Sequence, residues 1–363
     1  MLKAIEKIIK LSLLWLVAVI WPKRELPSLP LDISKIRNLL IYRPEKIGDL
    51  LMALPLISVL KRENPSLLID AIISPVALPL IDSDPRFNKI FLYSKKLWAD
   101  LMTAAGTRKT KYDIIIDLVG SDSATAAMTV LYISKKSAFT VSVGKQSLAR
   151  YYGRNFAIYP YRHMTESTLQ PLSLFGITAG PSDCYSPPAI DNRMYHNAEK
   201  FFANLNLKNS DRLIGLNISA GNKNRRWPDE NNIELIKQIG RTFPELKPVI
   251  FAAPDDFGRA RILAEKSEID TVVIPEGLNI REVSAIITKM SIFVSPDTSL
   301  IHIARALHIP VVGMYIPYNE NYRRWGPLSQ KYGILVAPGD DAIDKILPST
   351  VINEIRKVLA DQV

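Results

Sequence analysis

The chain has 363 residues, of which 47% are hydrophobic and 23% are charged, and its net charge is +10. This length exceeds one ordinary hydrophobic core and fits two domains of about 100 to 200 residues each. The composition excludes a disordered chain. The single cysteine, Cys184, excludes an internal disulfide framework and a cysteine-based metal cluster, and it favours a reducing compartment such as the cytoplasm. The positive charge predicts attraction to a polyanion: nucleic acid, an anionic membrane surface or a phosphorylated substrate.

Residues 1–24 predict an amphipathic helix that lies on a membrane surface. Apolar residues recur there at helical spacing, three lysines share another face, and an apolar run extends from Leu11 to Trp21. The run is shorter than the roughly 20 residues that span a bilayer, and Lys23 and Arg24 after it suit the headgroup region. The alternatives are a signal peptide or full span, although no clear cleavage site follows, and a helix buried against the protein.

From Asn38 onward, short β-like runs alternate with helical stretches, a pattern typical of parallel sheets covered by helices on both faces. The first half predicts strands at 38–43, 67–73, 89–92, 113–118 and 138–143, and helices near 49–63 and 122–133. The second half predicts strands at 213–217, 248–252, 271–274, 292–295 and 311–315, and helices near 229–242, 257–266, 280–289 and 299–307. The chain is therefore expected to be an α/β protein.

The two halves are separated by residues 176–191, whose glycine and proline pairs predict a linker. We expect an N-terminal domain at 25–180, a C-terminal domain at 190–345, and a last helix within 346–363 that packs on either domain. Both domains should be doubly wound. Ligands should then bind at the carboxyl ends of the strands, in a central cleft where the two domains face each other.

The first candidate motif, residues 42–55, follows the first predicted strand. Gly48 permits a close backbone turn, and Asp49 follows it at the start of a helix. A carboxylate in that position can accept the proton of an incoming hydroxyl group. The alternative interpretation is that Asp49 only caps the helix, because aspartate is common at helix starts.

The second motif, residues 217–230, follows the first strand of the second half. It combines small residues, which let backbone N–H groups approach a ligand, with three cations and a helix start. Such a loop can hold a pyrophosphate and stabilise a departing nucleotide diphosphate. An ordinary basic surface loop is the alternative. The candidate binding residues are Ser219, Gly221, Asn222, Lys223, Arg225 and Arg226.

The third motif, residues 293–307, is a strand followed by a capped helix. Asp297, Thr298 and Ser299 form the cap and the first helical turn, whose free N–H groups can bind an anion. His302 lies one turn further along the same face. In isolation a well-capped core helix is the better interpretation, and the motif gains its meaning from the other two.

Several common sites are excluded by the sequence. No G-x-G-x-x-G or Walker A motif is present, so the usual dinucleotide and P-loop sites lack their phosphate-binding parts. Asp82-Ser83-Asp84 resembles a metal-binding Asp-x-Asp motif, but Pro85 follows it and a loop is the better interpretation. No cluster of histidine, cysteine and carboxylate residues has metal-ligand spacing, so we expect no metal ion and no cofactor. The scattered basic residues disfavour nucleic acid as a partner.

Taken in this order, the three motifs resemble those of the ADP-heptose:lipopolysaccharide heptosyltransferases, glycosyltransferase family 9. Ile47-Gly48-Asp49 with Leu54-Pro55 matches the family's amino-terminal motif. Residues 219–228 match its glycine-rich loop ending in Trp-Pro, and residues 297–304 match its Asp-Thr/Ser-x-x-x-His-x-Ala segment. The resemblance covers residues 38–327. It implies a GT-B fold of two Rossmann-like domains and an inverting, metal-independent glycosyltransferase whose catalytic base is Asp49.

The resemblance also implies roles for other residues. The second and third motifs would bind the nucleotide, and an acidic residue that contacts the ribose in the family matches Asp255, with Asp256 as the alternative. The acceptor would bind in the N-terminal domain, where residues 150–163 form a basic and aromatic stretch. A solvated basic face with buried tyrosines is the other interpretation of this stretch. The acceptor-binding candidates are Lys46, Gly48, Arg154 and His163.

Two departures from the family pattern leave details open. Arg225 stands where typical members have a lysine, so Lys223 is a second candidate for that contact with the phosphates. The segment 315–318 replaces the family's Phe-Gly-Pro-Thr turn, which leaves the donor sugar undetermined.

The expected partners are a nucleotide-sugar donor, with ADP-heptose favoured, an anionic glycolipid or oligosaccharide acceptor such as lipopolysaccharide core, and the cytoplasmic surface of the inner membrane. Two alternative functions share this architecture. One is a sugar-nucleotide epimerase, which needs no acceptor. The other is a non-catalytic, membrane-associated protein that binds nucleotide sugars.

Overall fold

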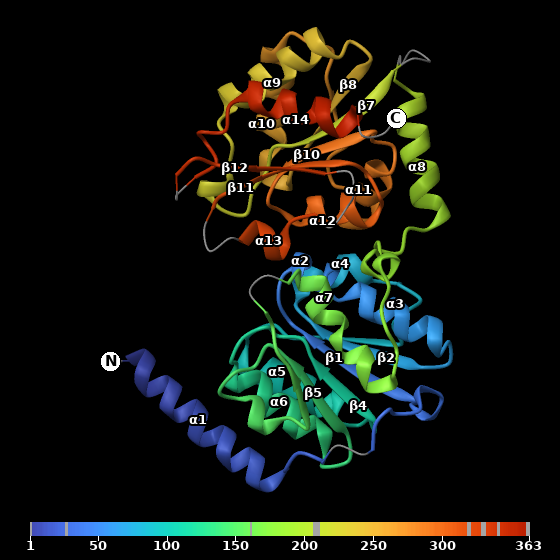
Figure 1. The fold of residues 1–363 in the computed structure, drawn as a ribbon, viewed down its shortest axis with the longest axis vertical. Helices are drawn as coiled ribbons and strands as arrows, with labels where there is room; N and C mark the ends of the chain where they lie inside the picture. The colour runs from blue at the N-terminus through green and yellow to red at the C-terminus, as the bar shows by residue number, and fades with distance from the viewer. Residues whose placement is uncertain are drawn as a thin grey trace. The chain divides into compact units, whose positions relative to one another are not determined.

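The computed structural model describes residues 2–25, 28–159, 162–205, 211–317, 321–327, 332–339 and 342–360. The chain divides into two compact units, Met1–Ser186 and Pro187–Val363. Each unit contains one six-stranded sheet with helices packed on it (Figure 1).

The first unit is built on a fully parallel sheet with the strand order β3-β2-β1-β4-β5-β6. Its strands are β1 (Asn38–Arg43), β2 (Leu68–Ile73), β3 (Lys89–Leu92), β4 (Ile114–Asp117), β5 (Phe139–Val143) and β6 (Arg154–Phe156). Its helices are α1 (Leu2–Ile20), α2 (Ile47–Leu51), α3 (Leu54–Glu63), α4 (Leu78–Ile81), α5 (Leu97–Thr107), α6 (Ala124–Ser134) and α7 (Met164–Leu169). The central strands β1 and β4 are almost entirely buried, as expected for parallel strands covered on both faces.

The second unit repeats this architecture with the strand order β12-β11-β10-β7-β8-β9. Its strands are β7 (Arg212–Asn217), β8 (Leu246–Phe251), β9 (Val272–Val273), β10 (Ile292–Pro296), β11 (Val311–Tyr315) and β12 (Tyr332–Val336). Its helices are α8 (Asn192–Ala203), α9 (Asp229–Thr242), α10 (Phe257–Ser267), α11 (Ile280–Ile287), α12 (Ser299–Ala306), α13 (Asn321–Trp325) and α14 (Pro348–Ala360). The last of these, α14, packs on α9 and β12 and therefore belongs to this unit.

Both sheets have the same winding. In each, the first three strands along the chain follow one another in one direction across the sheet, and the last three follow one another in the opposite direction. The winding reverses between β1 and β4 in the first unit and between β7 and β10 in the second. Ligands of open α/β sheets bind beside the carboxyl ends of the strands at such a reversal. All three sequence motifs begin at a strand on one of these reversals, because β1, β7 and β10 lead into them.

The N-terminal helix α1 packs on α6, and its N-terminal end extends away from the sheet (Figure 1). Leu14 is fully buried in the core of the first unit, and Leu11, Val17 and Ala18 pack against that core. At the end of the helix, the ring of Trp21 meets the edge of Tyr132, with 5.2 Å between centroids. In the part of the chain that the structure describes, no helix combines the length and apolar character that a membrane span needs. The sequence left open that residues 1–24 form a helix buried against the protein. The structure shows such packing for one face of α1.

Most predicted elements are found near their expected bounds, with one break. The helix expected at 49–63 is two helices, because α2 ends at Leu51 and α3 begins at Leu54. Pro55 lacks a backbone N–H donor and so starts a helix readily but does not continue one. The short edge strands β6 and β12 and several helices, including α5 and α8, were not anticipated.

Candidate active site

Asp49 lies in the first turn of α2, directly after β1. Its Oδ2 accepts a hydrogen bond of 3.0 Å from the backbone N–H of Lys46, the residue that precedes the helix. Asp49 thus closes the start of the helix from its third position. The side chain of Lys46 is exposed, and Gly48 lies within the helix, so the backbone turn expected at Gly48 is made before it.

A buried arginine supports this carboxylate from the end of β1. Arg43 is 1% exposed, and its Nη2 lies 3.3 Å from Asp49 Oδ1, while its Nε donates to the backbone carbonyl of Asp49. The same guanidinium lies 2.7 Å from Glu45 Oε2 through its Nη1. Burial raises the pKa of Glu45, Arg43 opposes this shift, and the charge of Asp49 adds to it. Two carboxylates therefore share one guanidinium cation at the carboxyl end of β1.

Of the other acceptor-site candidates, His163 is buried and Arg154 is exposed. His163 precedes α7, and its Nδ1 accepts a hydrogen bond of 3.1 Å from the N–H of Thr165. The hydroxyl of Thr168 in the same helix donates to the carbonyl of Met52, just after α2. His163 thus caps α7, and α7 contacts the turn that follows α2, the helix that carries Asp49. In the basic and aromatic stretch 150–163, Tyr161 lies outside the described residues.

In the second unit, Ser219 and Arg226 meet on Asp256. The Ser219 hydroxyl donates to Asp256 Oδ2 at 2.6 Å, and Arg226 forms an ion pair with Oδ1 of the same carboxylate. Asp256 is buried, whereas Asp255 is exposed. Asp256 therefore links the loop after β7 to the loop after β8, and Asp255 is the residue left open to solvent.

Arg225 pairs with the third motif. Its Nη1 lies 3.0 Å from Asp297 Oδ2 and also donates to the backbone carbonyl of Asp297. Burial raises the pKa of Asp297, and the charge of Arg225 opposes that shift. The loops after β7 and β10 are thus joined by a partly buried ion pair.

The start of α12 is organised by Asn217 at the end of β7. Its Nδ2 donates to the hydroxyls of Ser295 and Thr298, at 2.9 and 3.0 Å. Thr298 precedes α12 and Ser299 begins it, and both are partly exposed. His302 is buried one turn later, with its ring 6.3 Å from that of Trp325.

The remaining candidates for nucleotide binding in the loop after β7, here called the donor loop (residues 218–228), are exposed: Gly221, Asn222 and Lys223. Asn222 precedes a short 3-10 turn, η6 (Lys223–Arg225), and its Oδ1 accepts from the N–H of Arg225. A side chain added at Gly221 would meet no atom within 4 Å. Lys223 is exposed on this turn, so its ammonium group is available to a ligand without breaking the carboxylate contacts made by Arg225 and Arg226.

The sequence did not predict a buried charged cluster at the carboxyl end of β4. Lys145 Nζ lies 3.1 Å from Asp117 Oδ2 and donates to the carbonyls of Val119 and Ser121. The hydroxyl of Tyr152 donates to the same Asp117 oxygen at 2.5 Å. These bonds fix the loops after β4 and β5 beside β1. No sequence spacing connects these residues, although a carboxylate at the end of an apolar strand is a signal that points to Asp117.

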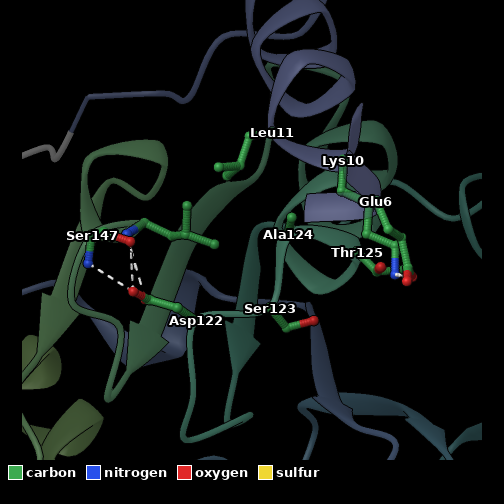
Figure 2. Close-up of a pocket in the computed structure, with 9 residues that line it drawn as sticks. Glu6, Lys10, Leu11, Asp122, Ser123, Ala124, Thr125 and Ser147 are labelled. Carbon is green, nitrogen blue, oxygen red and sulfur yellow. Dashed lines mark hydrogen bonds and ion pairs between the residues drawn. The ribbon is translucent and has the colours of Figure 1, made fainter. Parts of the chain in front are cut away.

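A cavity of about 440 Å³ opens between α1 and the start of α6 in the first unit (Figure 2). Its polar side is formed by Asp122, whose carboxylate accepts hydrogen bonds from the N–H groups of Gln146 and Ser147. Glu6 and Lys10 of α1 line the other side, where they form an ion pair. None of the predicted site residues lines this cavity, so it is separate from the candidate active site.

The arrangement suits transfer from a phosphorylated donor. The second unit offers exposed and partly exposed cations beside the N–H groups that begin α12, a combination that binds phosphate oxygens. The first unit offers a carboxylate held by a guanidinium at a strand end. Among the described residues there is no group of three or more histidine, cysteine or carboxylate side chains placed to hold a metal ion.

Comparison with known proteins identifies the family. A family model described as glycosyltransferase family 9 (heptosyltransferase) matches residues 104–346. The chain is 24% identical over 292 residues to lipopolysaccharide heptosyltransferase 1 of Salmonella typhimurium, which covers 77% of this chain and 88% of that one.

Solved structures show the same fold. The glycosyl transferase family 9 protein from Veillonella parvula has a TM-score of 0.77 and 19% identity, covering 92% of this chain and all of that one. The E. coli heptosyltransferase WaaC, solved with ADP, has a TM-score of 0.66 and 20% identity, covering 88% and 99%.

These matches confirm the predicted α/β fold with two Rossmann-like units of the GT-B type, and they confirm that the chain is a glycosyltransferase. The family model spans more than half of the sequence, so the chain belongs to glycosyltransferase family 9, the heptosyltransferase family.

Proposed function

We propose that this enzyme transfers heptose from ADP-heptose to lipopolysaccharide core or a similar glycolipid, with inversion at the anomeric carbon and without a metal ion. The observation that carries the proposal is the cationic loop after β7, which is tied to the start of α12 by the ion pair of Arg225 and Asp297. The names of the relatives support the donor and the acceptor, since they are lipopolysaccharide heptosyltransferases and one was solved with ADP.

On the donor side, the diphosphate of the nucleotide would lie against Lys223, Arg225 and the N–H groups at the start of α12. As the bond between the anomeric carbon and the phosphate oxygen breaks, negative charge grows on the departing ADP. Fixed cations and backbone dipoles stabilise that charge more than they stabilise the bound donor, which lowers the barrier. Asp255, exposed after β8, would contact the ribose.

On the acceptor side, Asp49 would take the proton of the acceptor hydroxyl while its oxygen attacks the anomeric carbon. Arg43 keeps this carboxylate in place, because it contacts both the side chain and the backbone carbonyl of Asp49. One carbon–oxygen bond forms as another breaks on the opposite side of the ring. No proton source other than the acceptor is needed.

We also propose that the enzyme works at the cytoplasmic face of the inner membrane, with α1 on the membrane. A glycolipid acceptor is anchored there, and α1 presents exposed apolar side chains such as Trp15 and Val19, both 60% exposed. The net charge of +10 favours an anionic surface.

The test is to incubate the full-length protein with ADP-heptose, with and without lipopolysaccharide core, and to measure ADP release. Release that requires the core supports the proposal. Conversion of the donor without any acceptor would identify an epimerase, and ADP binding without turnover would identify a non-catalytic binding protein.

The role of Asp49 is tested by Asp49→Ala, with Asp270→Ala, a surface carboxylate of the second unit, as the matched control. We expect Asp49→Ala to abolish turnover while ADP affinity stays within about twofold, because the nucleotide contacts lie in the second unit. Retained turnover would remove Asp49 from the mechanism.

A further inference from the structure

Two helices of the first unit, α1 and α5, carry half of the large hydrophobic side chains that are exposed among the described residues. Of the twenty large hydrophobic side chains exposed among the described residues, ten lie on α1 and α5. On α5 these are Trp98, Leu101 and Met102, which are 79%, 50% and 73% exposed. On α1 they are Ile8, Ile9, Leu13, Trp15, Leu16, Val19 and Ile20. Exposed apolar surface gathered in this way marks an interaction site.

α1 is apolar on two opposite sides. Leu14 points into the core of the first unit, and Leu16 and Val19 lie roughly opposite to it at 100° per residue. A helix that is apolar all round is stable when both sides are covered. The protein covers the side of α1 that faces α6, and it leaves Leu16 and Val19 exposed.

α5 lies beside α1, along the side of α1 that faces α6. At its end, the guanidinium of Arg108 stacks over the ring of Trp21, 4.8 Å from its centroid. At its start, the charge of Lys10 on α1 acts on the hydroxyl of Tyr93, just before α5. The three exposed side chains of α5 are spaced i, i+3 and i+4, so they form one ridge along the helix.

Exposed cations frame this surface. Lys95 and Lys96 precede α5, and Lys109 and Lys111 follow it, all with exposed side chains. Tryptophan and aliphatic side chains bordered by lysines suit the boundary between lipid tails and anionic headgroups.

We infer that the α5 ridge and the outer face of α1 together dock on a bilayer with anionic headgroups, so that α5 is a second membrane-binding element. The inference deepens the proposed membrane partner, but it does not depend on the chemistry of transfer. Two helices that bind one surface also restrict the orientation of the first unit on it, which a single helix does not.

The test is flotation of the full-length protein with vesicles of phosphatidylethanolamine and phosphatidylglycerol. We expect Trp98→Ala/Leu101→Ala/Met102→Ala to lower the bound fraction about 10-fold, because large exposed apolar side chains are lost. The matched control is Tyr195→Ala/Ile262→Ala/Leu347→Ala, three exposed hydrophobic residues of the second unit. It should float like the wild type.

Flotation of the α5 variant equal to that of the wild type would overturn the inference, as would equal binding of the wild type to vesicles of phosphatidylcholine alone. The melting temperature of each variant shows that it is folded. Because flotation needs no donor or acceptor, its result is independent of whether heptose is transferred.

Discussion

The three cations of the donor loop differ in what already surrounds them. Arg225 and Arg226 each contact a buried carboxylate of another loop, Asp297 and Asp256, whereas Lys223 is exposed. The arginines therefore hold the loop in shape, in addition to the phosphate contact proposed for Arg225. Lys223 is exposed, so its substitution should change ligand binding with less effect on the structure of the loop than a substitution of either arginine.

Arg225→Ala should lower the free energy of unfolding by about 2–3 kcal/mol at pH 7, because it leaves the buried Asp297 carboxylate without its cation. Burial raises the pKa of Asp297, so the folded state binds a proton more tightly than the unfolded chain. The deficit should therefore shrink as the pH falls towards about 4. Urea unfolding at both pH values measures it, and a deficit that does not change with pH would contradict this account.

Lys223→Ala should weaken ADP binding about 10-fold, the equivalent of about 1.4 kcal/mol, while unfolding stays within about 0.5 kcal/mol of the wild type. The reason is that an exposed ammonium group contributes to ligand binding and little to folding. Titration calorimetry gives the affinity. Unchanged ADP affinity in Lys223→Ala, with weakened affinity in Arg225→Ala, would assign the phosphate contact to Arg225.

The site could be predicted from sequence where a residue's position along the chain defines its place in the fold. Asp49 and Thr298 were placed at helix starts after strands because strand, turn and cap follow each other within a few residues. Contacts between distant segments were not predictable. Asp256 meets Ser219 across 37 positions, and Lys145 meets Asp117 across the β4–β5 crossover, with no periodicity to connect them.

At the scale of elements, α1 differs most from its expectation. The sequence suggested an amphipathic helix, and the structure shows a helix with one apolar side in the protein and another exposed. The two apolar sides have one cause. The run from Leu11 to Trp21 contains no charged residue, so apolar side chains occur all around the helix. Such a run defines a helix but not its partners.

Leu14→Ala should cost about 2–4 kcal/mol of stability, since its side chain is fully buried against α6. Leu16→Ala, two residues further on the exposed side, should cost less than about 0.5 kcal/mol. Thermal and urea unfolding of the two variants compare the same chemical change on opposite faces. Equal effects would mean that α1 does not pack on α6 in solution.

Strand recognition succeeded for the buried strands and also for the edge strands β3 and β9, but it failed for the edge strands β6 and β12. β1 and β11 were predicted with their observed bounds because β1 contains four consecutive apolar residues and none of the five residues of β11 is charged. β6, Arg154–Phe156, has three residues and one buried side chain, which is too short for any periodicity to register. Helices such as α8, with exposed polar residues and one narrow apolar stripe, gave a weak signal for a related reason.

At the scale of the whole molecule, the same winding occurs twice, and each unit carries one part of the candidate site at the reversal of its own sheet. Among the described residues, the hydrophobic cluster that contains β4 residues and the one that contains β10 residues each take all their members from one unit. Ligand binding to one unit should therefore stabilise the loops of that unit first.

Hydrogen exchange on the full-length chain tests this division. Saturating ADP should slow exchange in residues 217–226 and 297–302 of the second unit, because bound phosphates satisfy backbone N–H groups there and shift local opening. Residues 44–49 should exchange at an unchanged rate, since the proposed nucleotide contacts all lie in the second unit. The Lys223→Ala variant at the same ADP concentration is the matched control, with reduced protection in the same segments. Protection confined to the first unit would reverse the assignment of donor and acceptor sites, and it would place the acceptor chemistry after β7 and β10.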